Sequence, residues 1–453
     1  MNISDKLNII LDEYSKGNKK SAYKRFKKIY LQNSKNIKLR FNLAVMQQEL
    51  GLLKEAESNY LSLIKNSPEI KFKINLYNLY ITKELYKNAL DVINEIQSEK
   101  SNLIQVNQDK AYILYLLKNY KDSINECNKI LNVNINNSTA LNTIGLCLFS
   151  LQKFDEANKI LLRALGIDSN NIKILNSLGR LNHELRKSKE AEVYFLKAYK
   201  LNDNVFETLN NMAGFYMEEG QYSKAINFYQ KAKMLNPNNS VLLNNIAKTF
   251  ICIEEIKKAE AYTQKAISID PKNDEFKKTL SIILLKKYDF RNAWLYFDGR
   301  LGLSDFKSKN LTLELVKNKI PKGIVDKNSK ILILREQGIG DEILYGTMYS
   351  DLFKNFNNIT IESDERLLPL FKNSFKNNES SFFKLGSYST DTNKINNFDY
   401  IIYAGSLGKF FRNEKKSFKK NPYIKNLDDY YDLELNKVLK NHLILFLYLH
   451  IVN

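Results

Sequence analysis

The chain has 453 residues, of which 44% are hydrophobic and 12% aromatic, so it can bury a large core and is not an intrinsically disordered chain. Its formal net charge of +19 admits three kinds of partner: nucleic acid, an anionic membrane surface and an acidic protein. Lysine is spread along the whole chain and no base-reading or stacking motif is present, which makes nucleic-acid binding unlikely.

The three cysteines, Cys127, Cys147 and Cys252, lack the spacing of metal ligands, so the sequence predicts no metal site. The apolar run at residues 443–452 is far too short to cross a bilayer as a helix. The first residues, MNISDKLNIILDEYSKG, are polar and charged, unlike a signal peptide. We therefore expect a cytoplasmic protein without a membrane span.

A pattern with a period of 34 residues runs along the first two thirds of the chain. In its clearest copy, Ala225, Tyr229, Ala232 and Pro237 follow one another at spacings of four, three and five. The small residue that begins this frame recurs every 34 residues, except that the step from Ala56 to Ala89 is one residue shorter. Its positions are Ala22, Ala56, Ala89, Ser123, Ala157, Ala191, Ala225, Ala259 and Ala293. The pattern therefore predicts nine repeats between about residues 2 and 301.

Close packing of helices explains the residue types in this frame. Two antiparallel helices approach closely only where one offers a small side chain, and the aromatic residue four positions later fills the space between neighbouring pairs. A proline or polar cluster then ends the helix. Because each helix pair exposes an apolar face, it must stack on its neighbours, and the sequence predicts an all-α solenoid.

The frame A-x3-F-x2-A followed by P, repeated in register every 34 residues, resembles the tetratricopeptide repeat (TPR). The resemblance implies a superhelical solenoid whose concave face is lined by the first helix of each repeat. Positions five and six of each repeat then look into this groove. The asparagines at these positions that we predict to bind a partner are Asn142, Asn176, Asn210 and Asn244 at position five, and Asn211 and Asn245 at position six.

A primary amide donates and accepts hydrogen bonds at once, so a ladder of asparagines can bind an extended peptide backbone whatever its sequence. The run is similar to the asparagine ladder of the O-GlcNAc transferase TPR superhelix. The alternative is that asparagine is simply common in this chain and is also the family consensus at position six. The predicted partner is an extended protein or peptide.

The ninth repeat, YDFRNAWLYFDGRL at residues 288–301, carries the only tryptophan, Trp294. Similar sequences close the array in bacterial TPR proteins fused to glycosyltransferase-like domains. A capping helix that docks on the next domain predicts the same residues. A polar, lysine-rich connector follows, so the sequence predicts a TPR solenoid at 1–303, a linker at 304–329 and a second domain at 330–453.

Strand and helix patterns alternate in the second domain. Short apolar runs predict strands at residues 330–335, 358–362, 382–385 and 398–403, and helices are expected at 343–356 and 364–375. This alternation predicts a mostly parallel sheet covered by helices, as in one half of a doubly wound, Rossmann-like fold.

The loop between the first strand and helix, EQGIGDE, does not fit dinucleotide or P-loop binding. Gly338 and Gly340 supply G-x-G, but Ile343 occupies the third glycine position and G-K-[ST] is missing. Asp341 and Glu342 would also place negative charge where a helix N-terminus attracts phosphate. An aspartate at the carboxyl end of the sheet could instead act as a general base.

Residues 330–435 resemble the first domain of heptosyltransferase-like GT-B glycosyltransferases, through the G-x-G-D turn, the E-x-D-x-R-L-x-P-L segment at 362–370 and the G-S-L loop at 405–407. The resemblance implies that Asp341 is the catalytic base toward the acceptor. It also implies that the substrate lies against Gly338, Gly340, Gly405 and Ser406. The alternative interpretation of Asp341 is a plain helix cap.

A GT-B enzyme binds its nucleotide-sugar in a second domain, for which this chain has no sequence. We therefore expect no cofactor in this chain, unless a separate donor-domain polypeptide supplies a nucleotide-sugar. The last residues, NHLILFLYLHIVN, fit either a terminal strand or a frameshift. The favoured function is a protein-interaction scaffold, and the alternative is a glycosyltransferase completed by another chain; whether the chain is an enzyme stays open.

Overall fold

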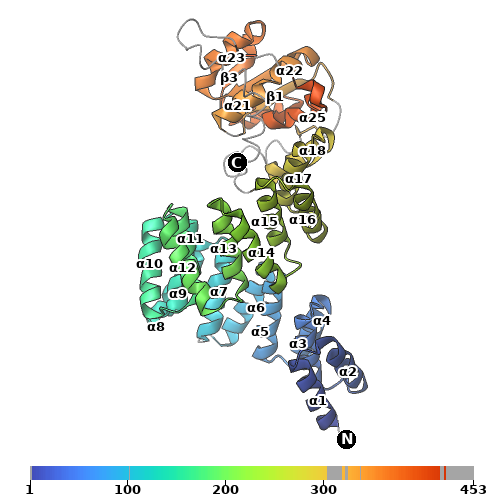
Figure 1. Cartoon of the computed structure of the whole chain (residues 1–453), viewed down its shortest axis with the longest axis vertical. Coiled ribbons are helices and arrows are strands. Elements are labelled where there is room, and N and C mark those ends of the chain that lie inside the picture. Colours follow the sequence, from blue (N-terminus) through green and yellow to red (C-terminus); the bar gives the residue numbers. More distant parts are fainter. Residues whose placement is uncertain are drawn as a thin grey trace. The chain divides into compact units, whose positions relative to one another are not determined.

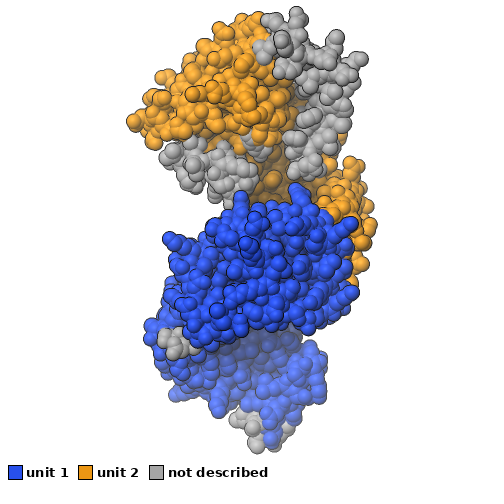
Figure 2. All heavy atoms as spheres, turned by 90° about the vertical axis from the view of Figure 1, so that its left-hand side faces the viewer, with its two compact units in different colours: residues 1–211 blue, residues 212–453 orange. Residues whose placement is uncertain are grey.

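The computed structural model describes residues 3–100, 103–303, 319–321, 325–336, 338–418 and 423–424. A helical array is followed by a small region that contains both helices and strands (Figure 1). The chain divides into two compact units, residues 1–211 and 212–453, which are coloured separately in Figure 2. The second unit holds the last repeats together with the α/β region.

Nine pairs of antiparallel helices form the repeat array in the described residues, as the 34-residue period predicts. The helices are α1 (Ile3–Ser15), α2 (Lys19–Gln32), α3 (Ile37–Glu49), α4 (Leu53–Asn66), α5 (Ile70–Thr82), α6 (Tyr86–Glu99), α7 (Ile104–Leu116), α8 (Tyr120–Val133), α9 (Ser138–Ser150), α10 (Phe154–Ile167), α11 (Ile172–Glu184), α12 (Ser188–Leu201), α13 (Phe206–Glu218), α14 (Tyr222–Leu235), α15 (Ser240–Cys252), α16 (Ile256–Ile269), α17 (Asp274–Lys286) and α18 (Phe290–Phe297). Odd-numbered helices are the first helices of their repeats, and even-numbered helices are the second.

The small residue of every second helix is fully buried, from Ala22 to Ala293. In the fifth and sixth repeats, a glycine of the first helix also packs closely against the second helix. A Cβ added to Gly145 would lie 2.5 Å from the side chain of Leu161, and one added to Gly179 would lie 2.5 Å from the ring of Phe195. The predicted close approach of paired helices is therefore confirmed.

The turn between the two helices of each repeat contains one residue with a positive φ angle. Glycine provides it in three repeats, at Gly17, Gly51 and Gly220. In the other six repeats a residue with a side chain adopts this conformation: Glu84, Lys118, Gln152, Arg186, Glu254 and Tyr288. The left-handed conformation costs a residue other than glycine about 1–3 kcal/mol, so helix packing in these repeats outweighs local strain.

Asparagine begins many of the first helices. The side chain of the residue before the helix accepts a hydrogen bond from a backbone N–H in the first turn at Asn36, Asn137, Asn171, Asn239 and Asn273. Such a cap contributes about 0.5–2 kcal/mol relative to alanine. Part of the high asparagine content thus has a structural role.

Consecutive first helices contact one another within each unit, as α7 does with α9, α9 with α11, and α15 with α17. Among the described residues, α8 and α10 make no comparable contact across the layer of second helices. Closer spacing on one side bends a stack of helix pairs toward that side. The first helices therefore form the inner layer of the array within each unit.

The α/β region contains a four-stranded parallel sheet with the order β3-β2-β1-β4. Its strands are β1 (Lys330–Leu334), β2 (Asn358–Ser363), β3 (Phe382–Lys384) and β4 (Tyr400–Tyr403). The helices and 3-10 turns around them are η1 (Asp298–Gly302), α21 (Ile339–Gly346), α22 (Tyr349–Asn355), η3 (Glu365–Leu367), α23 (Leu368–Ser374), η4 (Lys376–Ser381), α24 (Thr392–Asn396), η5 (Ala404–Leu407), α25 (Gly408–Phe411) and η6 (Lys415–Ser417). The predicted parallel sheet is confirmed.

Alternate side chains of β1 pack into two hydrophobic cores, one on each side of the sheet. Ile331 and Ile333 face the helices α21, α22 and α23, whereas Leu332 and Leu334 face the opposite side. On that second side, Leu301 of η1 packs against the sheet. Since η1 directly follows α18, the end of the ninth repeat forms part of the core of the α/β region.

Two features of the α/β region differ from the sequence predictions. The first helix of the α/β region begins at Ile339 rather than Ile343, and a break at Thr347–Met348 separates α21 from α22. The linker predicted at 304–329 lies mostly outside the described residues, as does the apolar end at 443–452, so the domain division stays a prediction. Among the described residues, no helix is both long and apolar enough to cross a bilayer.

Candidate functional site

The strand order places a topological switch point between β1 and β4, because the chain builds the sheet in opposite directions from β1. Open α/β folds bind their ligands in the crevice beyond the carboxyl ends of strands at such a point. Residues 335–336 and 404–406 follow β1 and β4 at this edge. The catalytic and substrate residues predicted from the glycosyltransferase resemblance are all near this edge in sequence.

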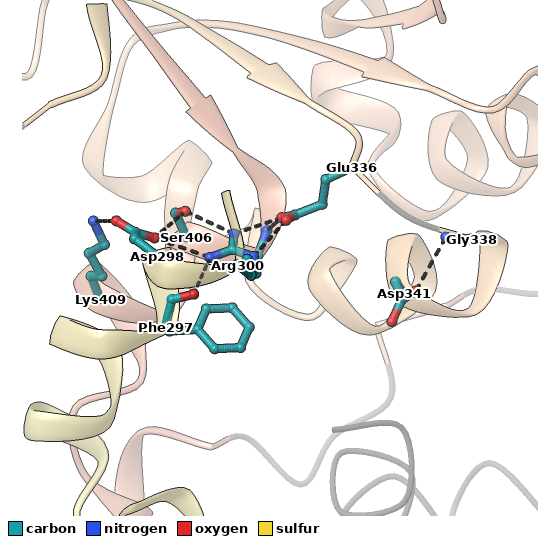
Figure 3. Close-up of polar contacts among 9 residues, drawn as sticks. Phe297, Asp298, Arg300, Glu336, Gly338, Asp341, Ser406 and Lys409 are labelled. Atoms are coloured by element: carbon teal, nitrogen blue, oxygen red, sulfur yellow. Dashed lines mark hydrogen bonds and ion pairs between the residues drawn. The ribbon is translucent and has the colours of Figure 1, made fainter. Parts of the chain in front are cut away.

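The side chain of Arg300, from η1, lies between the ends of β1 and β4 (Figure 3). Its guanidinium forms two hydrogen bonds with the carboxylate of Glu336, at 2.7 and 3.0 Å, and a third with the hydroxyl of Ser406 at 2.9 Å. Its Nη1 donates to Asp298 and to the carbonyl of Phe297, both at 3.1 Å. An arginine from the turn that follows the last repeat helix thus lies at the switch point.

Arg300 and Glu336 form a buried ion pair. Their side chains are 4% and 0% exposed. Burial opposes the charge on Arg300, but the carboxylate of Glu336 outweighs it and raises the pKa of Arg300 above its ordinary value. Because both side chains of this ion pair are buried, removal of either partner is costly.

Two of the predicted substrate-binding residues take part in this contact. The backbone N–H of Gly405 donates to Glu336, and the hydroxyl of Ser406 donates to Asp298 at 2.9 Å. A Cβ added to Gly405 would lie 2.5 Å from Glu336 Oε1 and 2.9 Å from Arg300 Nη2. Both residues are buried, and their polar groups already bond within the chain.

Trp294 of α18 forms the second part of the contact. Its indole N–H donates to the carbonyl of Arg412 at 2.8 Å, and its side chain is 5% exposed. Gly408 lets the ring approach, because an added Cβ would lie 2.6 Å from it. The guanidinium of Arg412 in turn bonds Asp351 and the carbonyl of Thr347, both at 2.8 Å. The last repeat helix thus packs against the α/β region, which agrees with the alternative interpretation of the ninth repeat as a capping helix.

The predicted catalytic base, Asp341, lies in the first turn of α21, apart from the Arg300 contact (Figure 3). Its Oδ2 accepts a hydrogen bond from the backbone N–H of Gly338 at 3.2 Å. Gly338 is the residue before the helix and Gly340 lies inside it. This geometry is that of a helix cap, the alternative interpretation offered by the sequence, and the catalytic role stays a prediction.

Two buried carboxylates near the end of β2, Glu342 of α21 and Glu362 of β2, also bond within the chain. Buried Glu342 accepts from Ser363 at 2.6 Å and pairs with Arg335, and its burial raises its pKa. Glu362 accepts hydrogen bonds from three backbone N–H groups in the loop that follows β3, at residues 386–389. In the described part of the chain, no group of three or more His, Cys, Asp or Glu is placed to hold a metal ion.

The predicted groove asparagines fall into two groups. Asn142, Asn176 and Asn244 are buried, with 7, 1 and 2% of their surface exposed. Within the described residues, the side-chain oxygens of these three accept no hydrogen bond. Asn210, Asn211 and Asn245 are half-buried, and Nδ2 of Asn211 has no acceptor among the described groups.

Position five of the repeat can link consecutive first helices. The amide of Asn176 donates to the hydroxyl of Thr208 in α13 at 2.9 Å, and Gln108 at the same position of the fourth repeat donates to Asn137 at 2.9 Å. The asparagines at this position are therefore less exposed than a groove ladder requires. A donor can reach their free oxygens only after the side chain rotates.

The sequence analysis missed Arg300 and Glu336 as a pair. They are 36 residues apart and lie on opposite sides of the connector, so no local pattern joins them. The available signal was a charged residue directly after a buried strand, at Glu336, together with an arginine at the end of an apolar helix. Neither feature identifies the other as its partner.

Tetratricopeptide repeat models match residues 138–171, 172–205, 206–239 and 241–273. No matched segment lies in the α/β region, so the resemblance of residues 330–435 to a glycosyltransferase rests on sequence motifs alone. No curated protein matches the chain.

Several solved structures share the helical repeat. A tetratricopeptide repeat protein from Parabacteroides merdae is 17% identical and covers 55% of this chain and 98% of its own, with a TM-score of 0.42. Pseudomonas aeruginosa PilF is 18% identical over 48% of this chain and 85% of its own, with a TM-score of 0.36.

YrrB, described as a TPR protein with an unusual peptide-binding site, is 21% identical over 41% of this chain and 95% of its own, with a TM-score of 0.30. Scores this low carry no argument about what the present chain binds. The matched repeats, the helix pairs and the buried small positions agree, and the chain contains a helical array of tetratricopeptide repeats followed by a small parallel α/β region.

Proposed function

We propose that the chain is a scaffold that binds an extended segment of a partner protein along its first helices. The observation that carries the proposal is the unmet hydrogen-bonding capacity of the asparagines at positions five and six. Asn142, Asn176 and Asn244 each hold an amide oxygen without a donor in the described structure, and Asn211 holds an amide nitrogen without an acceptor. A buried polar group left unpaired costs about 1–3 kcal/mol.

An extended peptide offers the groups that would pair with these amides. Its backbone alternates N–H donors and C=O acceptors, and Asn210, Asn211 and Asn245 are half-buried rather than buried. The buried amides of Asn142, Asn176 and Asn244 would bind the peptide backbone after their side chains rotate. The asparagines would bind the peptide backbone, which is the same for every sequence. Selectivity for a particular partner sequence would therefore come from other residues of the first helices.

Selection from a displayed library of short random peptides on the full chain provides the probe. We expect the combined variant Asn176→Ala/Asn210→Ala/Asn244→Ala to bind an enriched peptide about tenfold more weakly or worse. One hydrogen bond contributes about 0.5–1.5 kcal/mol, and 1.4 kcal/mol is a factor of ten in affinity. Fluorescence anisotropy of the labelled peptide measures the change.

A matched control replaces three exposed asparagines on second helices, Asn125, Asn128 and Asn227, with alanine. This control should bind the peptide as the native chain does. Urea unfolding of both variants separates binding from stability, because Asn176 also bonds Thr208. Unchanged affinity in the first variant would exclude the asparagine ladder.

The glycosyltransferase alternative predicts a different pattern. Transfer would need a donor-domain polypeptide and a nucleotide-sugar, and Asp341→Asn would abolish it, whereas peptide binding should survive the same substitution. In the described structure Asp341 accepts a hydrogen bond from the backbone N–H of Gly338, as a helix cap does. Arg300 lies between the ends of β1 and β4, near the switch point where the acceptor of a glycosyltransferase would bind.

We also propose a cytoplasmic location, since Cys127, Cys147 and Cys252 are free thiols. Recovery of the protein in a secreted or membrane fraction would contradict this proposal.

A further inference from the structure

An arginine and several aromatic residues gather on the first helices of unit 1. We name this group the aromatic–arginine site and define it as Tyr112 and Tyr115 of α7, Phe149 of α9 and Arg180 of α11, all within residues 1–211. The two tyrosines stack with ring centroids 5.9 Å apart, and Tyr112 is 43% exposed. An exposed stacked pair offers apolar surface to a ligand.

Arg180 lies over the ring of Phe149, with its Cζ 5.5 Å from the ring centroid. Stacking covers one face of the guanidinium but leaves the N–H groups at its edge free to donate. Among the residues that the structure describes, Arg180 forms no ion pair. A half-buried guanidinium held against an aromatic ring can bind a carboxylate through the N–H groups at its edge.

Tyr112 adds a second donor beside Arg180. Partial burial and the neighbouring carboxylate of Glu207 raise the pKa of Tyr112 to about 12, while Arg180 opposes this effect. The phenol therefore stays protonated at neutral pH and can donate a hydrogen bond. Arg180 of the sixth repeat and Glu207 of the seventh repeat are therefore both close enough to interact electrostatically with Tyr112 of the fourth repeat.

Resting on the function proposed above, we infer that the aromatic–arginine site binds an acidic side chain of the partner segment, through Arg180 and the hydroxyl of Tyr112. The apolar neighbour of that acidic residue packs on the rings of Tyr112 and Tyr115. The carboxylate of Glu207 repels the closely spaced charges of a nucleic-acid backbone more strongly than the single charge of one carboxylate, which favours a peptide. The net charge of +19 attracts an acidic partner to the chain.

The test uses the full chain and a library of short random peptides fused through their carboxyl ends, so that only side chains supply carboxylates. The native chain should enrich peptides with Asp or Glu next to an apolar residue. Arg180→Met should lose this preference and weaken binding of an enriched peptide by about tenfold or more. Arg180→Glu should reverse the preference toward Lys or Arg, which a purely structural role of Arg180 would not produce.

Arg163 provides a matched control, because it is an exposed arginine of the second helix α10 that bonds only the carbonyl of Ile135. Arg163→Met should keep the acidic preference. If Arg180→Met fails to fold, Tyr112→Phe replaces it, and the affinity for the acidic peptide should fall a few-fold.

The outcomes separate the two proposals. If the native chain enriches peptides without an acidic residue, or Arg180→Met keeps the preference, this inference is wrong and the scaffold function stands. If the native chain enriches no peptide at all, the scaffold function fails and the inference fails with it. Displacement of the peptide by single-stranded oligouridine, lost in Arg180→Met, would show that the site binds phosphate and would also overturn the inference.

Discussion

Replacing Arg300 with alanine is expected to lower the free energy of unfolding of the second unit by about 3–5 kcal/mol. The substitution leaves the fully buried carboxylate of Glu336 without its countercharge and removes a donor from Ser406. Trp294 is the only tryptophan of the chain and lies in the same contact, so its fluorescence reports the event directly. We expect a lower urea midpoint and red-shifted emission.

Arg291 is the matched control, since it is an exposed arginine on the helix that carries Trp294. Arg291→Ala should leave both the midpoint and the emission unchanged. The double variant Arg300→Met/Glu336→Met should lose less stability than Arg300→Ala, because two apolar side chains leave no unpaired charge. A native-like midpoint for Arg300→Ala would show that the buried pair does not stabilise the contact.

Truncating Phe195 to alanine is expected to cost about 3–5 kcal/mol in the first unit. The ring is 1% exposed and fills the space against Gly179, where no other side chain can replace it. Repeats contact only their neighbours, so the loss should lower the cooperativity of unfolding as well as its midpoint. Far-UV circular dichroism during urea unfolding measures both quantities.

Val193 lies on the same helix as Phe195 but is 63% exposed. Val193→Ala should therefore change the stability by less than about 0.5 kcal/mol. Equal effects of the two substitutions would contradict the repeat register, because the 34-residue frame places one side chain in the core and the other in solvent.

The repeat array could be predicted closely from the sequence because the same spacing of small and aromatic residues recurs in each repeat. The alanine frame identified the paired helices, and the aromatic residue after it identified the core. The six turns with a positive φ at residues such as Glu84 and Lys118 could not be predicted, because no residue type there favours that conformation. Packing of complete helix pairs imposes it.

The candidate sites were predicted less well, and for a different reason. Gly405 and Ser406 were predicted to bind substrate, which stays a prediction, and their bonds to Glu336 and Arg300 involve a residue from before the connector. Asn176 was placed on a first helix by the period, whereas its burial against Thr208 follows from the spacing between repeats. Contacts between distant segments carry no local sequence pattern.

Hydrogen–deuterium exchange of the full chain, with and without a peptide enriched from the displayed library, tests the scaffold proposal most directly. Our account predicts slower exchange in the first helices, above all α9, α11 and α15, and no change around α21 or residues 404–408. Protection confined to α21 and residues 404–408, with the first helices unchanged, would contradict it and place ligand binding in the α/β region.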